Sequence, residues 1–251
     1  TQIEIKKRFR KFLTEYSEGS STAPMYLAKV NQMCAQNAQS FEVSFAHLSQ
    51  SQPTLALWLT EQPEVMLELF NIEAMTVVST LYASYTSVHD TVYVRFTDVP
   101  ALESIRDLRQ KHLRSFLKAS GVVVRRTSVF PQLRQVKYTC LKCQESIGPY
   151  VQTGDKEVKP SRCPACQSTG PFKVNLAETV YQNYQKITLQ EAPGSVPAGR
   201  NPRQKEVILL HDLIDSCAPG REVEVTGVYE HSFDQRGNRV NGFPVFSTVI
   251  L

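Results

Sequence analysis

Four cysteines in two Cys-x-x-Cys pairs are the residues of this chain best suited to chemistry. They are Cys140, Cys143, Cys163 and Cys166, and nineteen residues separate the second from the third. A gap of two residues lets a tight turn bring both sulfurs of a pair to one metal, and the whole spacing is typical of a zinc site. Four thiolates complete a tetrahedral shell and leave no position for water. The sequence therefore predicts one structural Zn²⁺ and no catalytic residue.

Other enzymatic uses of these cysteines lack their required partners. A zinc deaminase needs a His-x-Glu motif, and none of the five histidines has Glu two residues later. The His-Glu-x-x-His of zinc hydrolases is missing, and so is the βαβ context of a thioredoxin-like redox pair. No Gly-x-x-x-x-Gly-Lys-Ser/Thr phosphate loop occurs, so ATPase activity is not expected of these residues. The two remaining cysteines, Cys34 and Cys217, are expected to pack as small hydrophobic residues.

Charge divides the chain into an acidic part and a basic part. Residues 1–94 carry six basic and nine acidic side chains, whereas residues 95–251 carry twenty-two basic and fifteen acidic ones. The basic part is the candidate for contact with a polyanion, and a solvated basic face without a partner is the alternative. A basic fold of this kind is expected to bind backbone phosphates with little sequence preference and strong salt dependence.

Two groups of side chains could contact a nucleic acid. Arg125 and Arg126 are adjacent on an expected strand, so they point to opposite faces and at least one points outward. Four tyrosines are possible stacking residues, although aromatic residues on strands more often belong to a core: Tyr138, Tyr181, Tyr184 and Tyr229.

The elements that must position these residues change character near residue 91. The first ninety residues have mainly helical spacing with one short strand at 41–45, and a basic amphipathic helix is expected between residues 100 and 118. The rest alternates with period two, which predicts strands at 92–96, 121–127, 132–139, 172–175, 181–191, 206–210, 222–230 and 243–251. Short strands punctuated by Gly and Pro favour a closed barrel or a sandwich. The expected fold class is therefore α+β, mainly β.

Two segments interrupt the expected barrel. The cysteine segment is entered from one strand and left into another, as an insertion would be, and residues 232–242 are too long for a tight turn and predict a projecting hairpin. The chain ends inside a strand-like run, so a longer protein is expected. No apolar stretch approaches the roughly 20 residues that cross a bilayer, and the start lacks a signal peptide. An intracellular protein without a membrane partner is expected.

Several motifs together resemble the minichromosome maintenance (MCM) family. They are Tyr138-Thr-Cys140-Leu-Lys-Cys143, Cys163-Pro-Ala-Cys166, Tyr181–Ile187 with Gln190-Glu191, and Asp212-Leu-Ile-Asp215 with Pro219-Gly220. Asn241–Ile250 and Gly121-Val-Val are most similar to the second subunit of this family. The resemblance covers nearly the whole chain and implies a family N-terminal domain. It implies a helical A subdomain at 1–92, an OB-fold barrel at 93–136 and 173–251, and an inserted zinc ribbon at 137–172.

The resemblance also implies a function in DNA replication. Family members form a ring, a heterohexamer in eukaryotes, which is loaded around origin DNA in the nucleus and later unwinds it with ATP. The N-terminal domain is the collar of that ring: its OB-folds line the channel, and its zinc ribbons contact neighbouring subunits and the opposing ring of a double hexamer. The expected partners are single- and double-stranded DNA and other MCM subunits. The AAA+ ATPase region, with its ATP and Mg²⁺, would lie C-terminal to this chain.

Family DNA contacts can be carried over only to matching positions. The tip of the N-terminal hairpin corresponds to Gln235–Arg239, which makes Arg236 and Arg239 candidates. Basic residues on the OB strands correspond to Arg125 or Arg126, Lys186 and Arg203. From the residues alone, a stand-alone single-strand-binding protein with an OB-fold and a zinc ribbon is the alternative.

Overall fold

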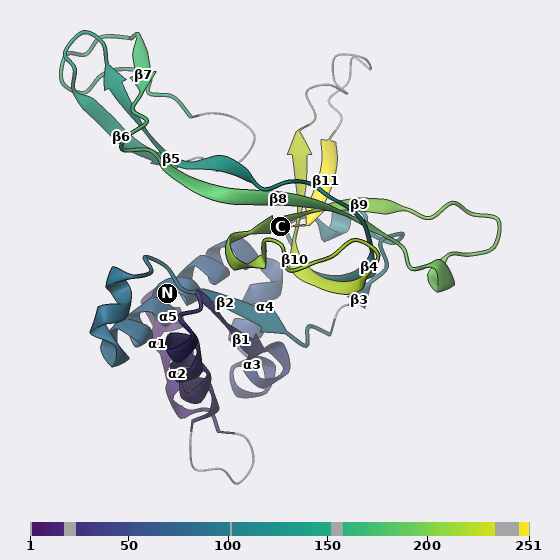
Figure 1. Ribbon diagram of the computed structural model, residues 1–251. Coiled ribbons are helices and arrows are strands. Elements are labelled where there is room, and N and C mark those ends of the chain that lie inside the picture. Colours follow the sequence, from purple (N-terminus) through teal and green to yellow (C-terminus); the bar gives the residue numbers. More distant parts are fainter. Residues whose placement is uncertain (1, 18–23, 101, 152–157, 234–245, 251) are drawn as a thin grey trace.

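The computed structural model describes residues 2–17, 24–100, 102–151, 158–233 and 246–250. A helical region comes first in the chain and lies beneath a β-rich region from which several arms project (Figure 1). The helices are α1 (Gln2–Glu15), α2 (Met25–Gln36), α3 (Phe45–Ser51), α4 (Pro53–Glu61) and α5 (Pro63–Leu81). The sheets are built from β1 (Ser40–Ser44), β2 (Tyr93–Thr97), β3 (Leu102–Glu103), β4 (Phe116–Arg126), β5 (Phe130–Cys140), β6 (Ser146–Val151), β7 (Phe172–Val174), β8 (Val180–Gln190), β9 (Gln204–Leu210), β10 (Glu222–Phe233) and β11 (Phe246–Ile250).

Local sequence signals set the bounds of the helices. Pro53 and Pro63 occupy the first turns of α4 and α5, where proline loses no hydrogen bond and its fixed φ suits a helix. Asn37 ends α2 in the left-handed conformation, with φ 54°, and asparagine tolerates this conformation better than most residues. The expected helices at the start of the chain are therefore confirmed.

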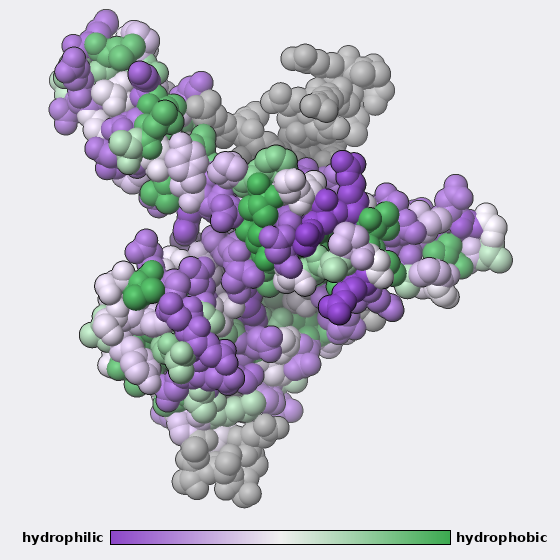
Figure 2. All heavy atoms as spheres, viewed as in Figure 1, coloured by the Kyte–Doolittle hydropathy of each residue, from purple (hydrophilic) through white to green (hydrophobic). Residues whose placement is uncertain are grey.

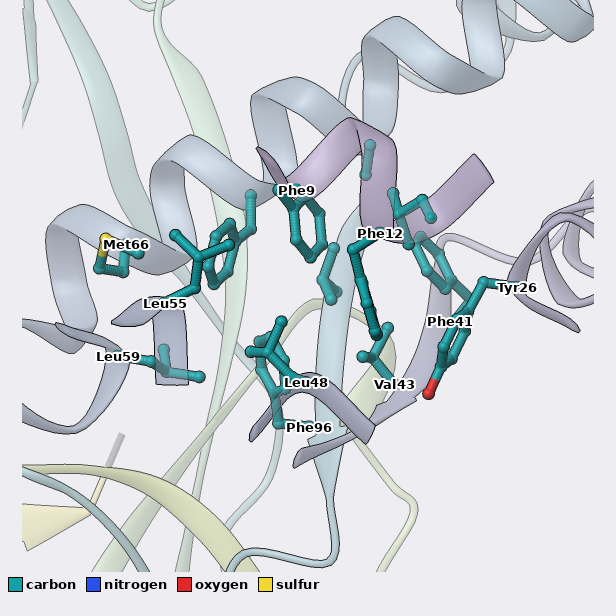
Figure 3. Packing of buried hydrophobic residues seen from close by; sticks show 14 of the residues in the cluster. Phe9, Phe12, Tyr26, Phe41, Val43, Leu48, Leu55, Leu59, Met66 and Phe96 are labelled. Carbon is teal, nitrogen blue, oxygen red and sulfur yellow. The ribbon is translucent and has the colours of Figure 1, made fainter. Parts of the chain in front are cut away.

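The hydrophobic core of the helical region also takes in Phe116 of β4 and Val228 of β10, and part of it is seen from close by in Figure 3. Phe9 of α1 stacks on Phe70 of α5 with ring centroids 4.2 Å apart, and the fully buried Tyr26 of α2 packs against Phe12 with centroids 5.0 Å apart. Val94 and Phe96 of β2 belong to the same core, because β2 pairs in parallel with β1. The sequence analysis placed this strand in the barrel. That expectation is wrong, because β2 pairs with β1 and packs against the helices.

Five strands close into a barrel in the order β4, β8, β9, β11, β10 and back to β4. The contact between β9 and β11 is parallel, and the other four contacts are antiparallel. In chain order this is the five-stranded Greek-key arrangement of an OB-fold. Ile187, Leu189, Val123 and Val207 fill its interior. The barrel expected from the alternating pattern, and the OB-fold implied by the resemblance, are confirmed.

The expected helix between residues 100 and 118 is wrong. This segment contains β3, turns and the single 3-10 turn η2 (Gln110–His112), and then enters β4. The guanidinium of Arg109 donates to the carbonyls of Arg106 (2.6 Å) and Leu108 (2.9 Å), and the Arg114 N–H donates to Tyr229 O at 2.7 Å. Hydrogen bonds from the Arg109 side chain and from the Arg114 N–H to β10 thus take the place of the backbone hydrogen bonds of a helix. Leu108 and Ile105, whose spacing imitated a helix, are buried against the barrel.

An arm made of β5, β6, β7 and the first half of β8 extends away from the barrel (Figure 1). In the chain this arm follows the first barrel strand and precedes the second, so it is an insertion, as the sequence indicated. At the other interruption, β10 and β11 pair antiparallel as far as Phe233 and Phe246. The expected hairpin tip, including Arg236 and Arg239, lies outside the described residues.

Polar side chains join the helical region to the barrel. Asp212, in the turn η4 (His211–Leu213), accepts hydrogen bonds from the Ser40 hydroxyl of β1 and the Arg95 guanidinium of β2. Beside it, the rings of Tyr93 and His211 stack with centroids 4.1 Å apart. Burial and the positive charges of Arg134 and Arg95 lower the pKa of His211 to about 4, so its ring is neutral at physiological pH.

We expect Asp212→Ala to loosen this junction. The change removes a half-buried acceptor and leaves the Arg95 guanidinium without it, which costs about 1–3 kcal/mol for a hydrogen bond to a charged group. Thermal unfolding should begin at a lower temperature, and protease cleavage between residues 97 and 104 should accelerate. Asp107→Ala is the control, because Asp107 is exposed and forms no ion pair with a described residue. Equal protease resistance of both variants would contradict this role of Asp212.

The surface in view is mainly hydrophilic over the helical region, with small separate apolar areas (Figure 2). Within the described residues, no helix combines the length and hydropathy required to cross a bilayer.

Candidate metal centre and nucleic-acid interface

The first cysteine pair lies in a tight turn at the end of β5. The Cys140 N–H donates to Glu145 O at 3.0 Å, and the Gln144 N–H donates back to Cys140 O at 2.8 Å. Gln144 adopts a positive φ of 59°, which reverses the chain directly after the Cys-x-x-Cys pair. The turn therefore points the sulfurs of Cys140 and Cys143 toward one region.

The second cysteine pair repeats this turn. The Cys163 N–H donates to Ser168 O at 2.9 Å, the Gln167 N–H donates to Cys163 O at 2.9 Å, and Gln167 has a φ of 54°. Each pair thus has the same bonds at the same spacing and the same left-handed residue. Two such turns facing each other form the core of a zinc ribbon.

The two turns bring all four sulfurs together. Every sulfur lies within 4.8 Å of the others, with 3.7 Å between Cys140 and Cys166 and 3.5 Å between Cys143 and Cys163. In a tetrahedral site with Zn–S bonds of about 2.3 Å, neighbouring sulfurs are about 3.8 Å apart. The cluster can hold a metal ion, and an all-thiolate set favours zinc or an iron–sulfur centre over magnesium or calcium.

The electrostatics of the cluster differ from sulfur to sulfur. Backbone N–H groups of Cys143 and Lys142 stabilise the Cys140 thiolate and lower its pKa to about 6. At Cys143 the Glu145 N–H lowers the pKa, but burial and hydrogen bonds to the neighbouring thiols outweigh it and raise the pKa to about 12. Four closely spaced sulfurs cannot all ionise unless a cation neutralises them, which suits a metal centre.

The arm around the cluster has little apolar material of its own. The buried cluster at the cysteines consists of Cys140, Cys163 and Ile147, with Tyr150 and Phe172 packed against them, and β5 adds the buried Val136 and Tyr138. So small a core cannot support a fold unaided. Metal binding is therefore expected to supply the folding energy of the arm.

A second candidate site lies on the outside of the barrel. Arg125 of β4 lies directly opposite Thr188 of β8, and Lys186 is two residues further along β8. The alternate positions Ile187 and Leu189 face the barrel interior. Since cross-strand partners share a face, Arg125 and Lys186 both point outward. Arg125 is exposed and forms no ion pair with any residue that the structure describes.

Two aromatic rings continue this surface along the arm. Tyr184 of β8 lies opposite Phe130 of β5, and the next pair, Gln132 and Gln182, is joined by a side-chain hydrogen bond of 3.1 Å. Phe130 is 53% exposed, unusually high for a phenylalanine on a strand. Sequence reasoning missed it because the strand was expected to begin at residue 132. We call the surface formed by Arg125, Phe130, Gln132, Gln182, Tyr184, Lys186 and Thr188 the outer face.

The other expected basic contacts lie elsewhere or are paired. Arg126 pairs with Ile187 in the ladder, at the end of the barrel interior, and its guanidinium contacts Asp215 at 3.1 Å. The Arg203 guanidinium donates to Arg106 O at 3.2 Å at the base of the loop after β8. The structure thus brings Arg125 and Lys186 together, but places Arg126 and Arg203 away from them.

The other expected stacking residues separate in the same way. Tyr138 and Tyr229 are buried and belong to the interior, as strand aromatics usually do. Tyr181 is 46% exposed but lies opposite Leu133, on the other side of the ribbon from Tyr184. Only Tyr184, among the four tyrosines, lies on the outer face.

Comparison with known proteins decides the family. Residues 6–98 match the MCM N-terminal domain, and residues 104–233 match the MCM OB domain, which alone covers more than half of the chain. The chain belongs to the MCM family. The resemblance seen in its motifs is confirmed.

Several similar relatives from eukaryotes bear the name DNA replication licensing factor MCM2. The chain is 46% identical to DNA replication licensing factor MCM2 of Oryza sativa subsp. indica over 98% of its length, and 46% identical to that of Xenopus tropicalis over 100%. It is 45% identical to the Schizosaccharomyces pombe protein over 98%. The aligned region covers 26%, 28% and 30% of these relatives, so the chain spans little more than a quarter of their length.

Proposed function

We propose that this chain is the N-terminal collar domain of a replication-licensing MCM subunit and binds DNA through the barrel. The outer face is the observation that carries the proposal, since it places two cations beside the exposed ring of Phe130 and the half-buried ring of Tyr184 on one sheet surface. Cations bind backbone phosphates, and aromatic rings stack on bases whatever the sequence. Single-stranded DNA can use both, whereas a duplex can use only the cations.

The hairpin between β10 and β11 would supply the second contact. Arg236 and Arg239 remain the proposed DNA-binding residues of its tip. The ladder of β10 and β11 leaves the barrel beside β9, which neighbours β8. A strand of DNA lying along the outer face would therefore pass close to the base of this hairpin.

The four cysteines would hold one structural Zn²⁺. Because four thiolates would fill the coordination shell, the metal would cross-link the two turns of the arm and would leave no open position for catalysis. We propose that the arm contacts neighbouring MCM subunits in a heterohexamer and the opposing ring in a double hexamer. The helical region at 1–92, with the added strand β2, would be a separate partner-facing subdomain. In the complete protein, which would act in the nucleus, an ATPase region with ATP and Mg²⁺ would drive unwinding.

The stand-alone single-strand-binding protein is less well supported. The relatives at 45–46% identity are licensing factors over three times as long as this chain. The barrel and the ribbon alone would serve either function, so the family membership favours the MCM subunit.

The DNA-binding proposal is tested by fluorescence anisotropy with a labelled oligothymidylate. We expect Arg125→Ala with Lys186→Ala to weaken binding at least tenfold at 0.1 M salt. The salt slope should also fall, by about 0.7 for each phosphate contact that is lost from a single strand. Arg236→Ala with Arg239→Ala should weaken binding independently of the first pair, with the zinc content unchanged.

The matched control is Lys6→Ala with Lys7→Ala, which removes the same charge from the solvent side of α1. It should leave affinity within about twofold, because exposed charges more than a Debye length away are largely screened at 0.1 M salt. An equal loss in the control, or none in the outer-face variant, would reject the outer face as the binding site.

A further inference from the structure

Two carboxylates are placed beside barrel cations that could contact DNA. Glu206 of β9 forms an ion pair with Lys186, with Nζ and Oε2 3.0 Å apart. Asp215 forms an ion pair with Arg126, with NH1 and Oδ1 3.1 Å apart. Of the three candidate cations Arg125, Arg126 and Lys186, only Arg125 has no carboxylate partner among the described residues.

The position of Asp215 is fixed by a buried side chain. Gln185 is 1% exposed, and its amide donates to Asp215 Oδ1 at 3.0 Å and accepts from the Asp215 N–H at 2.9 Å. The same Gln185 amide donates to Thr127 O at 3.0 Å, which holds the end of β4 next to this turn. A buried amide thus ties the carboxylate to the chain segment that carries Arg126.

The position of Glu206 follows from strand register. Glu206 pairs with Thr188 on β8, and Thr188 pairs with Arg125 on β4. Lys186 is two residues from Thr188 and therefore on the same face. The carboxylate consequently stands on the outer face itself, between the cation it neutralises and the strand β11.

We propose that Glu206 and Asp215 attenuate DNA binding by the barrel, holding Lys186 and Arg126 neutralised until a phosphate displaces them. This inference rests on the proposed function and specifies its regulation. The four charged groups of the two pairs are between 35% and 58% exposed. Such exposed ion pairs are individually weak, so a phosphate can replace the carboxylate. The barrel would then bind DNA loosely, which suits a ring that must move along its strand.

The prediction is a gain of affinity, which misfolding would not produce. Glu206→Gln and Asp215→Asn each free one cation and keep the shape of the side chain. With a slope of about −0.7 per phosphate on single strands, each freed cation should tighten oligothymidylate binding about fivefold at 0.1 M salt. The salt slope should steepen by about 0.7 for each variant. Anisotropy titrations of the zinc-loaded chain at several salt concentrations measure both quantities.

Glu222→Gln is the matched control, because Glu222 is exposed at the start of β10 and forms no ion pair with a described residue. It removes the same charge without freeing a cation, so the salt slope should not change. Equal gains in the control, or unchanged affinity in both test variants, would overturn the attenuation. If the wild type binds DNA and Arg125→Ala weakens that binding, either of these two results rejects the attenuation but not the proposed function. If neither the wild type nor the variants bind, the proposed function fails as well.

Discussion

Cys163→Ser is expected to release the metal and unfold the arm while leaving the barrel folded. Cys163 is one of the four cysteines that could hold the metal and is buried, and no further His, Cys, Asp or Glu among the described residues joins this cluster. Structural zinc in small modules contributes about 10–16 kcal/mol of apparent binding energy at neutral pH, and this energy is folding energy. The arm has only a few buried residues besides the cysteines, so its fold should not survive.

Native mass spectrometry measures the bound zinc, and limited proteolysis between residues 141 and 172 measures the state of the arm. Cys217→Ser is the control, because Cys217 packs against the barrel core and takes no part in the cluster. The control should retain one equivalent of zinc. One equivalent of zinc in Cys163→Ser, with unchanged protease resistance, would contradict the four-thiolate site.

Gly121→Ala is expected to have the second largest effect, on the barrel. A Cβ at this position would lie 2.5 Å from Gln190 O and 2.9 Å from a carbon of Leu189. The first contact is with backbone, so it can be relieved only by separating β4 from β8 where they close the barrel. Overpacking of this kind costs about 1–3 kcal/mol and sometimes more, and a loss of 3 kcal/mol lowers the melting temperature of a chain this size by about 10 °C.

Ser120→Ala is the matched control for this change. Ser120 is the preceding residue on β4, pairs with Glu224 of β10 and is partly exposed. Its replacement should move the midpoint of thermal unfolding by no more than about 2 °C, since surface substitutions usually stay within 0.5 kcal/mol. A Gly121→Ala variant as stable as this control would show that β4 and β8 are not closed as described.

Features set by neighbouring residues could be predicted from the sequence. The two cysteine turns depend on a spacing of a few residues, and the starts of α4 and α5 depend on Pro53 and Pro63. The barrel strands could be predicted because alternation marks which side of each strand is buried. Cys34 likewise packs against the helical core, as expected of a small hydrophobic residue.

Features decided by distant contacts could not be predicted. The region of residues 105–114 carries helix-like spacing, but Arg114 bonds to Tyr229, over a hundred residues away. The strand β2 alternates like a barrel strand, yet its register with β1 assigns it to the helices. Phe45 was expected to end a strand and instead begins α3.

The DNA-binding candidates show the same limit. Basic residues are visible in a sequence, but their partners are not, because Asp215 and Glu206 lie 89 and 20 residues from the cations they neutralise (215 − 126 and 206 − 186). Family resemblance identified Arg125, Arg126 and Lys186 together. The ion pairs distinguish Arg125, which has no carboxylate partner in the part of the chain that the structure describes, from Arg126 and Lys186.

Photochemical crosslinking maps the binding site most directly. A 4-thiothymidine oligonucleotide is crosslinked to the zinc-loaded chain at low salt, and the modified peptides are identified by mass spectrometry. If DNA binds on the outer face, we expect crosslinks to Phe130 and Tyr184. The double variant Phe130→Ala with Arg125→Ala should lose them. Crosslinks confined to the helical region, for example at Trp58 or Tyr82, which are also exposed, would contradict DNA binding by the barrel.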